Sequence, residues 1–130
     1  MAARDMVLSG LTVLIIEDEF LIAADVQRIV EDAGAVRVLL ASSTAAARAF
    51  LDGNSPIDIG ILDLMLGGED GFPLAQKFRD RQIPFVVATG LDRSLDLPDV
   101  VVVQKPYDDR AVIEALLKAL RTGHQSQTEA

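Results

Sequence analysis

Several polar residues lie directly behind apolar segments of the sequence, and their side chains are of types that suit phosphoryl chemistry. An acidic triplet, residues 17–19, follows LTVLII; Asp63 ends GILD, Thr89 ends PFVVAT and Lys105 follows VVVQ. A carboxylate can attack phosphorus and form an aspartyl phosphate, while a hydroxyl and an ammonium group can donate hydrogen bonds to phosphoryl oxygens. If the fold brings these residues together, they predict a phosphoryl-transfer site.

Each of these residues also has an ordinary structural explanation. An acidic triplet behind a strand is most often a solvated loop, and a single lysine such as Lys105 is most often a surface residue. Asp63 alone could cap a turn or a helix, and Thr89 alone is a residue with good strand propensity. The functional interpretation therefore depends on their joint placement behind four different apolar segments.

The apolar segments are short, rich in β-branched residues and nearly continuous, which is typical of strands buried on both faces of a parallel sheet. Segments with helical periodicity alternate with them. This alternation predicts an α/β fold with a doubly wound, five-stranded parallel sheet in the order 2-1-3-4-5, as in flavodoxin. We expect strands at residues 12–16, 36–41, 57–62, 84–89 and 100–103.

Four helices are expected, one after each of the first three strands and one after the last. Their signals are Gly34 behind the first helix, Ser43 or Thr44 as the cap of the second, Pro73 in the first turn of the third and Asp108 as the cap of the last. The segment GLDRSLDLPD, residues 90–99, lies between the fourth and fifth strands and is too short and too rich in helix-breaking residues for a full helix. The helix that this fold usually has there, its fourth, is therefore expected to be short or absent. The expected helices span residues 20–33, 44–52, 73–81 and 109–121.

In a sheet of this order, ligands bind at the carboxyl ends of the strands, where the strand order reverses between the first and third strands. Glu17, Asp18 and Asp63 would meet in that crevice. Three converging carboxylates repel one another unless a cation joins them, and a set of oxygen ligands selects a hard ion such as Mg²⁺. The sequence therefore predicts a Mg²⁺ site beside the phosphoryl acceptor.

Composition sets the broad class of the protein. The chain has 130 residues, 50% hydrophobic and 25% charged, which is typical of one globular domain; we place it at residues 11–122, with residues 1–10 and 123–130 as flexible ends. The net charge of −8 argues against nucleic-acid binding. The apolar segments are too short to cross a bilayer, and the chain has no cysteine, so we expect a cytoplasmic protein without membrane contact.

The motifs IIEDE, ILDLMLGGEDG, VVATG and VVQKPY resemble, in this order, those of CheY-like receiver domains of two-component response regulators. The resemblance covers residues 11 to about 121. It implies that Asp63 accepts a phosphoryl group from a phosphohistidine of a sensor histidine kinase. It also implies that Mg²⁺ is bound by Asp18, Asp63 and the backbone carbonyl of Met65, with Glu17 acting directly or through water.

The resemblance also implies that Thr89 and Lys105 respond to the phosphoryl group, and that the bond between Lys105 and Pro106 is cis. Gly90 can bring the backbone close to the phosphoryl group because it has no side chain. We therefore expect the switch to use Thr89, Gly90 and the segment 90–99, which would become ordered on phosphorylation.

Two features depart from the common receiver pattern. Val102 occupies a position that is usually aromatic, and the stretch between Thr89 and Lys105 is short. With PFVVATG, these features resemble a receiver subgroup that carries a Pro-Phe-x-Phe-Ala-Thr-Gly-Tyr-like motif and that often stands alone beside atypical histidine kinases. Val87 and Leu91 replace two aromatic residues of that motif.

The expected function is thus that of a stand-alone, monomeric response regulator, not an enzyme beyond its own phosphotransfer and dephosphorylation. A histidine phosphotransfer protein or a target protein would be its further partner, and it would act as shuttle, phosphate sink or effector. A receiver-like scaffold that is not phosphorylated remains the alternative. A phosphohydrolase fits less well because Met65 replaces its second carboxylate, and a flavin or dinucleotide binder would need a glycine-rich loop where residues 17–19 are acidic.

Overall fold

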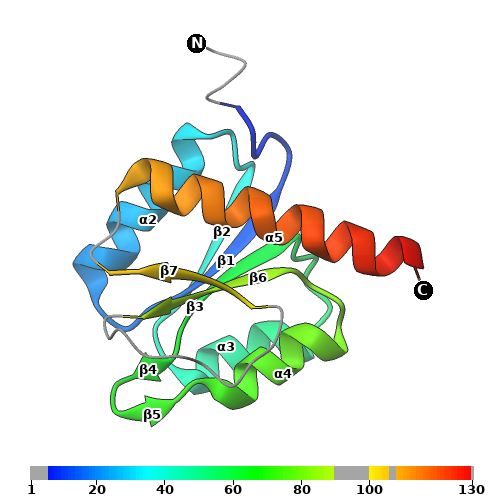
Figure 1. Cartoon of the computed structure of the whole chain (residues 1–130). Coiled ribbons are helices and arrows are strands. Elements are labelled where there is room, and N and C mark those ends of the chain that lie inside the picture. The colour runs from blue at the N-terminus through cyan, green and yellow to red at the C-terminus, as the bar shows by residue number, and fades with distance from the viewer. Residues whose placement is uncertain (1–5, 90–99, 106–107, 130) are drawn as a thin grey trace.

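The computed structural model describes residues 6–89, 100–105 and 108–129. Its centre is a sheet of five parallel strands in the order β2-β1-β3-β6-β7, which confirms the predicted α/β fold and the order 2-1-3-4-5 (Figure 1). The ends of the strands differ only slightly from the prediction. The strands are β1 (Thr12–Ile16), β2 (Arg37–Ala41), β3 (Ile59–Asp63), β6 (Phe85–Thr89) and β7 (Val101–Gln104).

Helices cover both faces of the sheet. Helices α2 (Phe20–Asp32) and α5 (Asp109–Glu129) lie on one face, and α3 (Thr44–Asp52) and α4 (Phe72–Asp80) lie on the other (Figure 1). Successive residues of a strand point to opposite faces, so every residue of β1 is buried. Val13 and Ile15 belong to the core on the α2 and α5 side, while Leu14 and Ile16 belong to the core on the α3 and α4 side.

The helix ends follow local signals in the sequence. The Ser43 hydroxyl accepts a hydrogen bond from the Ala46 N–H at 3.1 Å, so Ser43, rather than Thr44, caps α3. Pro73 lies in the first turn of α4, as predicted. Gly34 follows α2 with a φ of +104°, a conformation that favours glycine.

A small antiparallel hairpin follows β3 directly and was not predicted. Its strands are β4 (Met65–Leu66) and β5 (Glu69–Asp70), and Gly67 and Gly68 form the two-residue turn between them with φ values of +56° and +87°. Both central residues of a type I′ turn need positive φ, which explains the two glycines. Leu66 is buried in the core beside α3 and α4, so the hairpin is attached to the body of the domain.

Regular structure extends into both predicted ends, while their flexibility stays a prediction. Residues 6–10 form a turn in which the Leu8 side chain is fully buried and the Leu8 N–H donates to the Ala33 carbonyl at 2.8 Å. At the other end, α5 continues to Glu129, well past the predicted end near residue 121, because the backbone hydrogen bonds of a helix do not require an apolar period. The segment 90–99, with the predicted short fourth helix, and Pro106 with its predicted cis bond lie outside the described residues.

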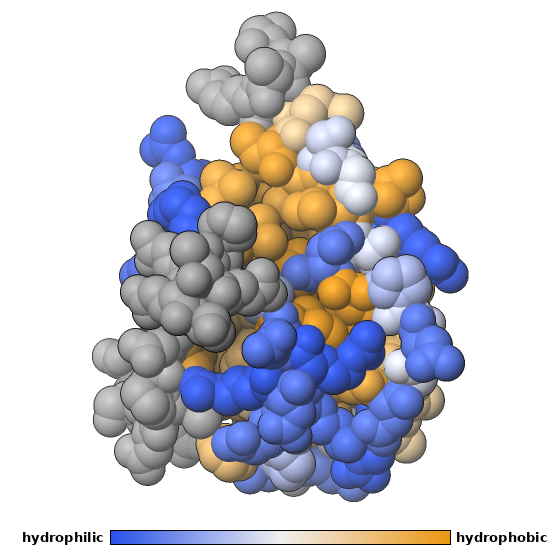
Figure 2. Space-filling model, turned by 90° about the vertical axis from the view of Figure 1, so that its right-hand side faces the viewer, coloured by the Kyte–Doolittle hydropathy of each residue, from blue (hydrophilic) through white to orange (hydrophobic). Residues whose placement is uncertain are grey.

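The two ends of the sheet differ in character. Figure 2 views the end at which the strands begin, where an apolar strip lies between hydrophilic surfaces. The strands finish at the opposite end, which also carries the hairpin (Figure 1). In the described part of the chain, no helix combines the length and the apolar character that a membrane crossing requires.

Candidate phosphoryl-acceptor site

The acidic residues predicted from the sequence meet at the carboxyl end of the sheet. Strands β1 and β3 are parallel neighbours, with Ile16 opposite Leu62. The next residue along each chain segment, Glu17 and Asp63, therefore lies at the same end of the sheet. One carboxylate oxygen from each of Glu17, Asp18 and Asp63 lies within 4.8 Å of the others. The crevice between the first and third strands therefore holds the carboxylate cluster.

Lys105 directly follows β7, and β6 lies between β7 and β3 in the sheet; its side chain nevertheless contacts this cluster. Its Nζ lies 2.8 Å from Asp63 Oδ2 and 2.9 Å from Glu17 Oε1. The side chains are 16% exposed for Lys105, 9% for Asp63 and 3% for Glu17. One ammonium group thus binds two buried carboxylates that come from different strands.

Burial and the neighbouring groups shift the pKa of Glu17 in opposite directions. Burial raises the pKa of Glu17 above its ordinary value, and the neighbouring Asp63 carboxylate raises it further. The hydrogen bonds from Lys105 and from the Glu19 N–H, the latter 3.2 Å long, lower the pKa of Glu17 but do not cancel the effect of burial. The effect of burial on the pKa of Glu17 thus outweighs the stabilisation that Lys105 gives to the charged carboxylate.

Asp18 differs from the other two carboxylates because its side chain is exposed. Asp18 Oδ2 accepts a hydrogen bond from the Gly67 N–H at 2.9 Å, which joins it to the tip of the β4–β5 hairpin. The Met65 N–H donates to Asp63 Oδ1 at 3.0 Å. The hairpin that follows Asp63 thus contacts two of the three carboxylates.

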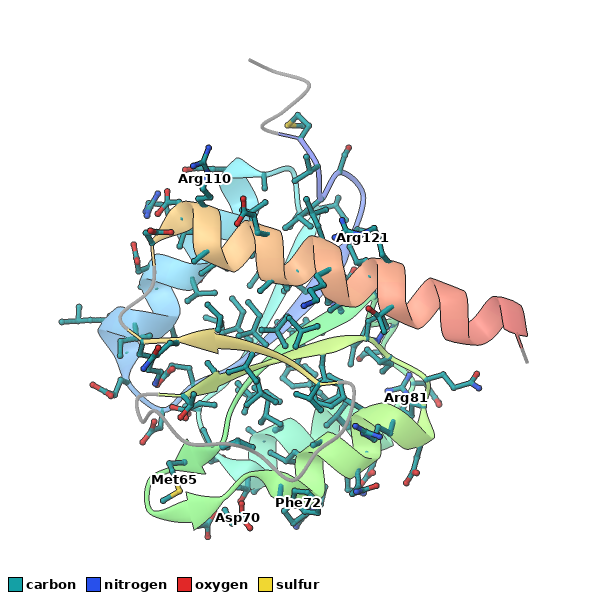
Figure 3. The ribbon with its side chains drawn as sticks, viewed as in Figure 1. Met65, Asp70, Phe72, Arg81, Arg110 and Arg121 are labelled. Atoms are coloured by element: carbon teal, nitrogen blue, oxygen red, sulfur yellow. The ribbon has the colours of Figure 1, made fainter. Side chains whose placement is uncertain are left out.

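Two further predicted residues lie at the same end of the sheet. Thr89 is the last residue of β6. Its carbonyl accepts the Lys105 N–H at 2.8 Å, which aligns the backbone of Lys105 with the end of β6. The Met65 side chain lies on the hairpin, at the end of the molecule opposite Arg81 (Figure 3), and is 51% exposed. The predicted contribution of the Met65 carbonyl to a metal stays a prediction, and Gly90 lies outside the described residues.

The donor atoms of the cluster fit a small, hard cation. Glu17, Asp18 and Asp63 offer only oxygen atoms, which is the ligand type that Mg²⁺ prefers. Two oxygens bound to one Mg²⁺ at about 2.1 Å lie at most about 4.2 Å apart, so the observed spread of up to 4.8 Å needs only a small adjustment.

Comparison with known proteins identifies the family. Residues 13–117 match the family described as the response regulator receiver domain. The chain belongs to this family. Receiver domains are signalling modules that bind Mg²⁺ at an acidic pocket and interact with a histidine kinase or a phosphotransfer partner. In this chain, Glu17, Asp18 and Asp63 form an acidic group at the carboxyl end of the sheet.

Individual relatives agree with this assignment. The heme response regulator HssR of Staphylococcus haemolyticus is 29% identical over 115 residues, which cover 83% of this chain and 50% of HssR, so the chain spans half the length of this curated relative. The response regulator PhyR from Brucella abortus superposes with a TM-score of 0.80 at 28% identity, covering 92% of this chain and 51% of PhyR. SdrG from Sphingomonas melonis Fr1 is 36% identical with a TM-score of 0.70, covering 85% of this chain and 97% of SdrG.

The structure adds features that the sequence reasoning missed. The hydrogen bond between Gly67 and Asp18 was not foreseen, although the pair Gly67–Gly68 is itself a hairpin signal. Phe20 and Leu21, in the first turn of α2 and just behind the acidic triplet, are 79% and 80% exposed. An apolar pair therefore lies on the surface next to the carboxylate cluster.

Proposed function

We propose that this protein is a response regulator in which Asp63 accepts a phosphoryl group from a phosphohistidine of a sensor histidine kinase in a Mg²⁺-dependent reaction. The observation that carries the proposal is the position of Lys105 Nζ, 2.8 Å from Asp63 Oδ2, in a crevice that also holds Glu17 and Asp18. A nucleophile, a candidate metal site and a cationic donor for phosphoryl oxygens thus occur within one small volume.

In the proposed reaction the Asp63 carboxylate attacks phosphorus and forms an aspartyl phosphate. The P–N bond of the phosphohistidine breaks, and its electron pair returns to the imidazole ring. Lys105 moves its hydrogen bond from Asp63 to a phosphoryl oxygen, while the Thr89 hydroxyl donates to another. Mg²⁺, when bound, screens the charge of the carboxylates and of the incoming phosphoryl group.

Glu17, Asp18, Asp63 and the backbone carbonyl of Met65 are the proposed ligands of Mg²⁺. The carboxylates of the first three are close enough to share one ion. Both buried carboxylates also contact Lys105, which keeps them on the same side of the crevice.

The proposed partner is a sensor histidine kinase, including the atypical class that goes with the motif around Thr89. Phe20 and Leu21 support a protein partner, because an exposed apolar pair beside the acceptor offers area that a docked protein can bury. A histidine phosphotransfer protein or a target protein is the further partner, so that the regulator acts as a shuttle, a sink or an effector. The switch is proposed to involve Thr89, Gly90 and residues 90–99.

Incubation with acetyl phosphate and Mg²⁺ tests this function, with the intact mass of the protein as the readout. The expected result is one added phosphoryl group in the natural sequence and none in Asp63→Asn. Asp70→Asn is the matched control, because Asp70 is an exposed hairpin residue that accepts the Phe72 N–H at 3.0 Å, and asparagine can accept that bond as well.

Other outcomes of this experiment would contradict the proposal. An unmodified protein that keeps its fold would favour the non-phosphorylated scaffold. Continuous release of inorganic phosphate from phosphate monoesters, lost in Asp63→Asn, would favour a phosphohydrolase.

A further inference from the structure

Asp18 is the one carboxylate of the cluster that the core does not hold in place. Glu17 and Asp63 are buried and bound by Lys105, whereas the Asp18 side chain is exposed. Its one hydrogen bond in the described part of the chain comes from the Gly67 N–H, at 2.9 Å. An exposed carboxylate that is to bind a metal in one orientation needs such a partner, because otherwise it samples several rotamers.

Gly67 is able to aim its N–H at Asp18 because the hairpin turn is tightly defined. Leu66, the residue before it, is buried in the core, and Leu66 pairs with Glu69 across the hairpin. Gly67 and Gly68 then complete the turn with positive φ values. The direction of the Gly67 N–H is therefore fixed by the two short strands on either side of it.

The outer strand of the hairpin is attached to another part of the domain. The Thr44 hydroxyl, in the first turn of α3, donates to Glu69 Oε1 at 2.6 Å. This hydrogen bond is short and lies at the surface, so its role is to fix the position of the outer strand rather than to add much stability. The hairpin is thus held at Leu66 by the core and at Glu69 by α3.

We propose that the β4–β5 hairpin is a positioning element for the metal site, in which Thr44 and Glu69 fix the hairpin so that the Gly67 N–H orients the Asp18 carboxylate for the cation. Neither Thr44 nor Glu69 is a metal ligand; both act through the hairpin. This inference rests on the proposed Mg²⁺-dependent function, since it assigns residues to the support of the same site.

Mg²⁺ titration followed by amide NMR tests the inference, with Thr44→Val as the main variant. Valine has nearly the shape of threonine but cannot donate to Glu69, and the substitution leaves the charge of the protein unchanged. Removing a group bonded directly to a metal ligand typically weakens binding by about tenfold or more, so we expect a smaller loss, of about fivefold, from this indirect contact. The Gly67 amide should also exchange with solvent faster in the metal-free variant.

Two further variants separate positioning from general stability. Thr44→Ser keeps the hydroxyl and should restore both Mg²⁺ affinity and the protection of the Gly67 amide. Asp52→Asn is the matched control, because it weakens a bond of similar length, 2.7 Å to Lys77, at the opposite end of α3 and away from the hairpin. Its Mg²⁺ affinity should equal that of the natural sequence.

The outcomes distinguish this inference from the function on which it rests. If the natural sequence does not bind Mg²⁺, the proposed function fails. If the natural sequence binds Mg²⁺ and Thr44→Val binds it equally well or more tightly, the function stands and the positioning role of the hairpin is wrong. Equal losses of affinity in Thr44→Val and Asp52→Asn would also overturn the positioning role.

Discussion

Lys105 and Arg28 each hold carboxylates that come from separate parts of the fold, but the two clusters differ in burial. Lys105 binds Asp63 and Glu17, and its side chain is 16% exposed. Arg28 in α2 binds Asp109 at the start of α5, with N–O distances of 3.1 and 3.2 Å, and the two side chains are 49% and 63% exposed. The contacts are similar in length, so burial is the main difference between them.

This difference assigns distinct roles to the two clusters. Exposed ion pairs contribute little to stability because water and salt screen them, whereas a buried charge that loses its partner is costly. The two buried carboxylates of the Lys105 cluster therefore depend on its ammonium group. The Arg28 cluster, by comparison, joins two helices at the surface through exposed contacts.

Lys105→Met should have the largest effect. Two carboxylates would remain buried without their ammonium group, so we expect the free energy of unfolding in Mg²⁺-free buffer to fall by about 2 kcal/mol. Phosphorylation of Asp63 by acetyl phosphate should slow by about 100-fold, because the donor to the phosphoryl oxygens is lost. Urea denaturation and the rate of mass gain measure the two effects.

The control for this variant is Lys118→Met, which removes an exposed lysine from α5. It should change neither quantity appreciably. Equal losses in the two variants would mean that burial does not distinguish Lys105.

Asp18→Asn should have the next largest effect, and its two readouts should move in opposite directions. Asparagine can still accept the Gly67 N–H, but the cation loses a charged ligand, so Mg²⁺ affinity should fall by about tenfold. In Mg²⁺-free buffer the denaturation midpoint should rise, because one of three clustered negative charges is gone. A lower midpoint without Mg²⁺ would contradict the view that these carboxylates repel one another.

The double variant Asp63→Asn/Lys105→Met sharpens the comparison. Removal of both partners of a buried pair costs less than removal of one, because only Glu17, and no longer Asp63 as well, is then left as a buried carboxylate without the ammonium group. We expect the double variant to regain about 1 kcal/mol of the stability that Lys105→Met loses. Purely additive losses in a double-mutant cycle would show that Lys105 and Asp63 do not interact energetically.

Arg28→Gln should have the smallest effect. Although it removes contacts to Asp25, Asp32 and Asp109, all of these side chains are at least half exposed, so the denaturation midpoint should stay within experimental error of the natural value. The variant and the natural sequence should have the same denaturation midpoint at low salt and at high salt. A loss comparable to that of Lys105→Met would break the distinction between the two clusters.

The elements with strong local signals were predictable from the sequence. The five strands are nearly continuous apolar runs, and the topology of such a sheet places Glu17, Asp18 and Asp63 at one edge without knowledge of any contact. The buried pairing of Lys105 with Glu17 depends on side-chain directions, which a pattern of residue types does not contain.

The missed elements are those whose signals are short. The strands of the β4–β5 hairpin have two residues each, too few to show an alternating pattern, so the main signal is the Gly67–Gly68 pair. Leu8 belongs to the short stretch MVLSGL, which is too short to show a helical or strand period, and its burial depends on the turn at residues 6–10 and on the end of α2. Such contacts between distant segments are set by tertiary packing.

Helix α5 has a practical consequence for experiments on this receiver. With 21 residues it is about 30 Å long, and its last turns extend beyond the sheet at the end opposite Asp63 (Figure 1). A fluorophore or a surface linker attached after the last residue of α5 would therefore lie far from the carboxyl end of the sheet. That end would stay accessible to a histidine kinase. Attachment close to Leu8 would instead disturb a side chain that belongs to the core.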